Sequence, residues 1–161
     1  MYKAIEIQAP NHLKLKHGYT SVFLAGSIEM GKAEDWQRKI IEAVPDEPFI
    51  FFNPRRSDWD SSWGQTKEDP RFVEQVQWEL EALEVADHIV MYFDPKTMSP
   101  ISLIEMGVHI RDPKLVVICP DGFWKKGNVD ITCDFYKAKQ VDSIDAYITL
   151  LKSGIFRKHK I

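Results

Sequence analysis

Short apolar runs alternate with longer amphipathic segments along the chain, and this alternation predicts an α/β fold. Four runs have the composition of strands in a sheet core: 21–25, 49–52, 88–93 and 115–119. A fifth, short strand is expected near 139–141. Four segments carry apolar residues at helical spacing: 34–44, 71–86, 101–110 and 143–151. Strands that alternate with helices indicate a doubly wound parallel sheet, here of about five strands, with helices on both faces.

The loops at the carboxyl ends of the strands are the expected place for a ligand. In open parallel sheets, ligands bind there, near the point where the strand order reverses. We therefore expect a site on the loops that follow Ala25, Phe52, Phe93 and Cys119.

Composition and charge exclude several classes of protein. The 161 residues suit one domain, 1–161, and a net charge of −3 gives no broad basic field for a nucleic-acid polymer. No apolar run approaches the ~20 residues of a membrane helix, and the first residues do not resemble a signal peptide. Cys119 and Cys133 form no disulfide framework, so we expect a cytoplasmic protein. The five histidines lack metal-ligand spacing, and each is interpreted as a surface or capping residue.

The stretch VFLAGSIEMGKA, residues 22–33, fits most of a phosphate-binding P-loop. Gly26, Gly31 and Lys32 have the required spacing, but Ala33 stands where a Ser or Thr should hold Mg²⁺. Glu29 also places a carboxylate where backbone N–H groups should cradle phosphate. A P-loop phosphotransferase is therefore the weaker hypothesis, and Gly26 can equally serve a tight turn.

Four segments carry a more specific resemblance: AGSI at 25–28, FNPRRSDWD at 52–60, EQVQWELEALEVAD at 74–87 and MSPISLIEMG at 98–107. In order and spacing they resemble the nucleoside 2-deoxyribosyltransferase-like family, within the wider group of deoxyribosyltransferases and nucleotide N-glycosidases. The resemblance implies a flavodoxin-like (Rossmann-like) fold and a homo-oligomer. It also implies cleavage of the bond between a base and a (deoxy)ribose, on a small nucleoside or nucleotide, without a metal or organic cofactor.

The resemblance assigns the nucleophile to Glu105 in IEMG. Cleavage of a nucleoside C1′–N bond builds positive charge at C1′, which a carboxylate can stabilise and then bond. Glu79 is the second candidate, because the family has an acidic residue at the matching place that contacts the base, and Gln75 lies one helical turn earlier. The alternatives are a first-turn Glu105 that only answers the helix dipole and a Glu79 on a solvated charged face.

Further candidates for substrate binding stand on the loops after the strands. They are Gly26, Ser27, Asn53 and Asp94. Asp94 could also be a plain turn residue before proline. The loop after Asn53 carries two arginines and two tryptophans that could serve a ligand, an interface or the loop itself.

Two positions depart from the family pattern, and a third candidate comes late in the chain. Ser99 stands where many deoxyribosyltransferases have an Asp that binds the sugar 5′-hydroxyl, which favours a 5′-monophosphate, although Ser99 before Pro100 is also a good helix start. Phe23 replaces a tyrosine that positions the nucleophile. Asn128 and Asp130 lie in a segment interpreted as a loop that enters the neighbouring subunit's site.

Three functions therefore remain open from the sequence. The first is an enzyme acting on the N-glycosidic bond, by transfer or by hydrolysis of a deoxynucleoside 5′-monophosphate or nucleoside. The second is the P-loop phosphotransferase, and the third is a non-catalytic nucleotide-binding module.

Overall fold

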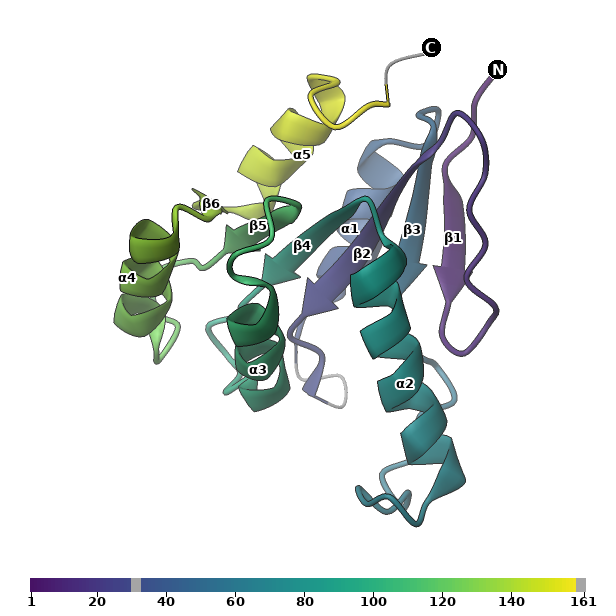
Figure 1. Ribbon diagram of the computed structural model, residues 1–161, viewed down its shortest axis with the longest axis vertical. Coiled ribbons are helices and arrows are strands. Elements are labelled where there is room, and N and C mark those ends of the chain that lie inside the picture. The colour runs from purple at the N-terminus through teal and green to yellow at the C-terminus, as the bar shows by residue number, and fades with distance from the viewer. Residues whose placement is uncertain (30–32, 159–161) are drawn as a thin grey trace.

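Six strands form one parallel sheet in the order β1-β3-β2-β4-β5-β6 (Figure 1). The computed structural model describes residues 1–29 and 33–158. The strands are β1 (Ile5–Gln8), β2 (Thr20–Gly26), β3 (Phe49–Asn53), β4 (His88–Tyr92), β5 (Leu115–Ile118) and β6 (Lys139–Val141). The helices are α1 (Trp36–Ala43), α2 (Pro70–Val85), α3 (Pro100–His109), α4 (Lys126–Tyr136) and α5 (Ile144–Lys152).

Helices cover both faces of the sheet, as the apolar pattern predicts. Successive side chains of a strand point to opposite faces, and β2 shows this directly. Phe23 packs in the core beneath α2, α3 and α4, whereas Leu24 packs in the core beneath α1 and α5. Figure 1 shows α2 and α3 on the near side of the sheet and α1 behind it. The four central strands, β2 to β5, are therefore mainly apolar because both of their faces are buried, whereas the edge strands β1 and β6 keep polar residues.

The strand order defines where a ligand should bind. Apart from β1 at the edge, the order of the other five strands is that of the flavodoxin-like fold, so this prediction is confirmed. The chain runs outward from β2 to β3 and then crosses back to β4, so the order reverses between β2 and β4. The carboxyl ends of these two strands, at Gly26 and Tyr92, lie side by side in the pairing register.

Gly26 is required by the close approach of these two strands. Its φ is +128°, a conformation that side chains rarely adopt, and an added Cβ would lie 2.2 Å from the Tyr92 carbonyl oxygen. The tight-turn interpretation therefore accounts for this glycine without any bound phosphate.

Two elements differ from the sequence prediction. The sheet has six strands rather than about five, because the N-terminal segment pairs with β3, where Ile5 lies opposite Ile50. The segment containing Asn128, interpreted as a loop, is helix α4. Its glycine, asparagine and β-branched residues have low helix propensity, but Val129 and Cys133, four residues apart, are both buried against the sheet. Packing thus decides an element that local preference does not indicate.

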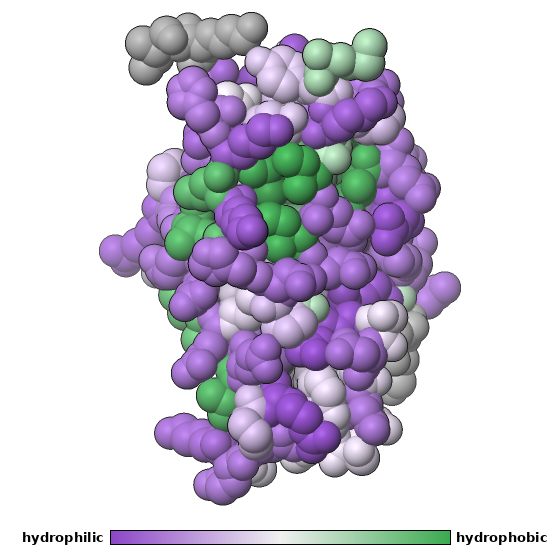
Figure 2. All heavy atoms as spheres, turned by 90° about the vertical axis from the view of Figure 1, so that its right-hand side faces the viewer, coloured by the Kyte–Doolittle hydropathy of each residue, from purple (hydrophilic) through white to green (hydrophobic). Residues whose placement is uncertain are grey.

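The surface on the side of β1 is mostly hydrophilic, with one apolar patch surrounded by polar residues (Figure 2). Among the described residues, no helix is long and apolar enough to cross a membrane.

Candidate active site

A cluster of buried hydroxyl groups joins the ends of β2 and β4. Ser27 follows Gly26, and its hydroxyl accepts a hydrogen bond from the backbone N–H of Asp94 at 2.8 Å. The Thr97 hydroxyl contacts the Ser27 hydroxyl at 3.0 Å and the Ser99 hydroxyl at 2.7 Å, and the two serine hydroxyls also contact each other. All four residues are buried. The structure therefore brings Ser27, Asp94 and Ser99 together, as their places at strand ends predict, and adds Thr97.

The carboxylate of Glu29 closes the turn before α3. Its Oε1 accepts hydrogen bonds from the backbone N–H groups of Met98, at 2.6 Å, and of Ser99. Ser99 occupies the N-cap position with Pro100 after it, but its side chain makes no capping hydrogen bond because it points to the hydroxyl cluster. A carboxylate from another segment thus binds the two N–H groups that immediately precede α3.

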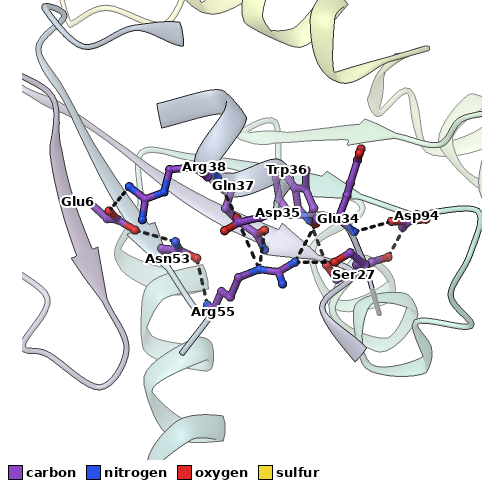
Figure 3. Close-up of polar contacts among 11 residues, drawn as sticks. Glu6, Ser27, Glu34, Asp35, Trp36, Gln37, Arg38, Asn53, Arg55 and Asp94 are labelled. Carbon is purple, nitrogen blue, oxygen red and sulfur yellow. Dashed lines mark hydrogen bonds and ion pairs between the residues drawn. The ribbon is translucent and has the colours of Figure 1, made fainter. Parts of the chain in front are cut away.

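Asp94 is held on both carboxylate oxygens by backbone groups. Oδ1 accepts from the N–H of Lys96 at 2.8 Å, and Oδ2 accepts from the N–H of Glu34 at 3.1 Å (Figure 3). These contacts fit the turn-residue alternative and tie the loop before α1 to the end of β4. Of the P-loop residues, Gly31 and Lys32 lie outside the described residues.

Asn53 belongs to a second network, at the ends of β1 and β3 (Figure 3). Its side-chain amide donates to Glu6 at 2.8 Å, and its carbonyl oxygen accepts from the backbone N–H of Arg55 at 3.0 Å. The Arg55 guanidinium then donates to Gln37 at 3.2 Å and to the Glu34 carbonyl oxygen at 2.8 Å. This network fastens the loop before α1 to the edge of the sheet. Glu6 was missed from the sequence because its strand was not recognised.

Helix α2 carries Glu79 and Gln75 on its inward side. Gln75 is buried and donates through Nε2 to Glu79 Oε1 at 2.8 Å. Burial raises the pKa of Glu79 to about 7, although the hydrogen bond from Gln75 lowers it. Glu79 is therefore not part of a solvated charged face. Trp78, which directly precedes Glu79 in the sequence, packs edge-on against Phe23 in the core.

Glu105 lies on the buried face of α3. Its exposed fraction is 9%, and the neighbouring Met106 belongs to the core. Burial first, and the nearby charge of Glu79 second, raise the pKa of Glu105 to about 8. The charge of Glu79 on α2 therefore reaches Glu105 on α3, and the pair as a whole retains a proton near neutral pH. A first-turn glutamate that only answers the helix dipole would be exposed and ionised, so that alternative does not describe Glu105.

Other candidates lie apart from this pair or differ from the prediction. Asn128 is exposed on α4, and Asp130 is bound by Lys126 at 3.1 Å and by Gln140. His109 is predicted to be a surface or capping residue, but it is 7% exposed, because it falls on the inward face of α3 one turn after Glu105. Among residues 1–29 and 33–158, no group of three or more His, Cys, Asp or Glu could hold a metal ion.

A surface hollow of about 550 Å³ lies elsewhere on α2. It is lined by the N-terminal loop, including His12 and Leu13, and by Val73, Gln77 and Trp78. Its lining contains neither Glu79 nor Glu105, so it is separate from the carboxyl pair.

The fold and site together define a flavodoxin-like α/β protein with two largely desolvated carboxyl groups on α2 and α3. The sequence profile described as "Nucleoside 2-deoxyribosyltransferase like" matches residues 19–123. The chain belongs to this family, and the resemblance found in the sequence is confirmed. No curated protein matches the sequence. A solved structure, a conserved protein from Enterococcus faecalis V583, is similar at 16% identity and a TM-score of 0.56, covering 85% of this chain and 99% of that chain. At this identity the likeness shows the fold alone.

Proposed function

We propose that this protein cleaves the N-glycosidic bond of a (deoxy)nucleoside, with Glu105 as nucleophile and Glu79 as proton donor to the base. Membership of the family suggests an enzyme of the glycosyl-transfer type. The observation that carries the proposal is the buried pair on α2 and α3, in which burial keeps a proton near neutral pH. A pair that shares one proton has one carboxylate for C1′ and one acid for the base. In the productive form that proton is on Glu79, although Glu105 has the higher pKa of the two in the protein without substrate.

The reaction proceeds in two steps. An oxygen of Glu105 bonds to C1′ while the C1′–N bond breaks, and its electron pair leaves with the base, which takes the proton of Glu79. A second base or water then gives a proton to Glu79 and attacks C1′, and Glu105 leaves as a carboxylate. Transfer and hydrolysis differ only in which acceptor reaches C1′ first.

A panel of deoxynucleosides and their 5′-monophosphates, with and without an acceptor base, tests the proposal. We expect free base to appear in chromatograms, and at the same rate in EDTA because neither step uses a metal. A requirement for Mg²⁺ would favour the P-loop alternative, and binding without turnover would favour a nucleotide-binding module.

The Glu29 carboxylate, bound to the turn before α3, affects which 5′ group a substrate can carry. Ser99 alone favours a 5′-monophosphate, but Glu29 places a negative charge on the N–H groups of Met98 and Ser99. A phosphate that approached this turn would meet that charge, whereas a neutral 5′-hydroxyl would not. We therefore propose the unphosphorylated nucleoside as the preferred substrate and the monophosphate as the alternative.

Glu29→Gln is expected to lower the KM for the 5′-monophosphate by about fivefold, since it removes a repulsion worth on the order of 1 kcal/mol. The KM for the nucleoside should change by less than about twofold, because the glutamine carbonyl oxygen can still accept from the same N–H groups. Initial rates with both substrates measure the ratio. Glu81→Gln, an exposed position on α2, is the control. A monophosphate KM that the Glu29 variant leaves unchanged would contradict this assignment.

Exposed apolar residues on the outer faces of α3 and α4 support the proposed homo-oligomer. Ile101, Ile104 and Val108 on α3 are 59%, 63% and 69% exposed, and they lie along one stripe at helical spacing. Ile131 and Phe135 on α4 are similarly exposed, at 71% and 76%. Apolar surface of this extent is typical of protein interfaces.

A further inference from the structure

The hydrogen-bonding groups of Gln75 are used within the protein. Its Nε2 donates to the Pro54 carbonyl oxygen at 3.1 Å and to Glu79 Oε1 at 2.8 Å. Its Oε1 accepts from the Arg56 guanidinium at 3.4 Å. An amide with both N–H groups engaged has no donor left for the edge of a base. The base contact expected for Gln75 therefore competes with three protein partners.

Arg56 reaches Gln75 from the loop after β3 and is itself held on two sides. Its Nε and Nη2 donate to the two carboxylate oxygens of Asp58, each at 2.8 Å, in a two-point pair. Its guanidinium lies over the Trp63 ring, 5.0 Å from the ring centre. The Arg56 side chain is 8% exposed. These contacts leave Nη1 directed at Gln75.

The two ends of the Gln75 amide are fixed by groups of opposite kind. Arginine has donors only, so the atom that faces Arg56 must be the carbonyl oxygen. A backbone carbonyl has acceptors only, so the atom that faces Pro54 must be the nitrogen. Both requirements turn an N–H of Gln75 toward Glu79, where the Oε1 atom of Glu79 accepts the hydrogen bond.

We propose that Arg56 and Gln75 are positioning residues that act through Glu79. Together they hold Glu79 Oε1 with an N–H group, so that the other carboxyl oxygen carries the proton destined for the base. This inference rests on the proposed function for the role of that proton. The hydrogen-bond chain from Asp58 through Arg56 and Gln75 to Glu79 is independent of the substrate.

The groups around Glu79 determine how its pKa should change when the hydrogen-bond chain from Arg56 is broken. Burial favours the protonated form of Glu79, and the charge of Glu79 in turn raises the pKa of Glu105 on α3. Gln75 faces it from its own helix and favours its ionised form. The Arg56–Asp58 pair stands behind Gln75. Loss of the Gln75 donor should therefore make Glu79 hold its proton to higher pH.

The test combines three variants with one control. Arg56→Met keeps an unbranched stem over Trp63 and removes the donors, Gln75→Leu removes the amide, and the double variant carries both changes. Arg71→Met is the matched control, because Arg71 also lies over Trp63, at 5.1 Å, but pairs with Asp69. The readouts are kcat/KM for base release against pH and the titration of the Glu79 carboxyl carbon by ¹³C NMR. The second readout needs no activity.

We expect Arg56→Met to raise the pH at the midpoint of the Glu79 titration and to lower kcat/KM at neutral pH several-fold. Gln75→Leu should have the larger effect on both. The double variant should titrate like Gln75→Leu, because Arg56 acts only through the amide. Arg71→Met should titrate like the natural protein. Arg56→Lys, which keeps the charge but loses the planar fork, should shift the midpoint in the same direction and replaces Arg56→Met if that variant does not fold.

Two failures are distinguishable. The inference is overturned, whatever the activity, if the pH midpoint of the Glu79 titration stays unchanged in the Arg56 variants. It is also overturned if the double variant shifts that midpoint by the sum of the two single shifts. If the panel shows no base release but the midpoints move as expected, the proposed function fails and the positioning of Glu79 stands.

Discussion

Glu105→Gln is expected to reduce base release by at least about 1000-fold, because glutamine cannot donate an electron pair to C1′ and leave again. The amide has nearly the same size and can occupy the same buried place on α3. Single-turnover mixing with the preferred deoxynucleoside, followed by chromatography, measures the step directly. Glu81→Gln on α2, an exposed position, should keep full activity.

The same substitution should leave the protein folded and more stable at alkaline pH. The pKa of Glu105 is raised from 4.5 to about 8 in the folded chain. Its contribution to stability is therefore fully present below pH 4.5 and is lost as the pH rises toward 8. Glutamine has no such loss. The free energy of unfolding of Glu105→Gln, measured by urea titration, should therefore exceed that of the natural protein by about 2 kcal/mol at pH 8 and equal it at pH 4.5.

Full turnover by folded Glu105→Gln would remove the nucleophile from the proposal. An inactive variant that is also destabilised at pH 8 would instead show that the loss of activity is structural, and that Glu105 has a partner that this account does not include.

Glu79→Gln is expected to lower kcat/KM by about 100-fold to 10,000-fold for substrates whose base needs a proton to leave. The reason is that the base side of the site would offer an amide in place of an acid. A substrate with a leaving group that needs no proton, such as a p-nitrophenyl deoxyriboside, should lose much less. The contrast between the two substrates measures the contribution of the acid.

The pH profile should change in a characteristic way. Burial places the pKa values of Glu79 and Glu105 at about 7 and about 8, and the two protons leave in steps that belong to the pair. Activity needs one proton on the pair, so kcat/KM should be bell-shaped with its maximum between these values. In Glu79→Gln the alkaline limb should disappear. The acid limb should move to lower pH, because Glu105 no longer has a charged neighbour. A variant that kept both limbs would show that another group supplies the proton.

The apolar pattern was sufficient for most of the fold. Strands β2 to β5 lie at the predicted apolar runs, and β6 lies at the predicted short strand. The sheet is parallel with helices on both faces, which is why its central strands are mainly apolar. The polar residues at strand ends also indicated the right edge of the sheet. Ser27, Asp94 and Ser99 meet there because neighbouring parallel strands end at the same edge.

Only the tertiary structure decided how those residues are used. Glu29 binds the turn before α3 from a different segment. Arg56 reaches Gln75, and through it Glu79, from a loop that has no periodic pattern. Helix α4 forms against its own local preference because it packs on the sheet. The sequence by itself therefore determined which positions are buried and which lie at the strand ends. Hydrogen-bond partners and the pKa values of buried carboxyl groups depend on distances between segments far apart in the chain, and these exist only once the chain is folded.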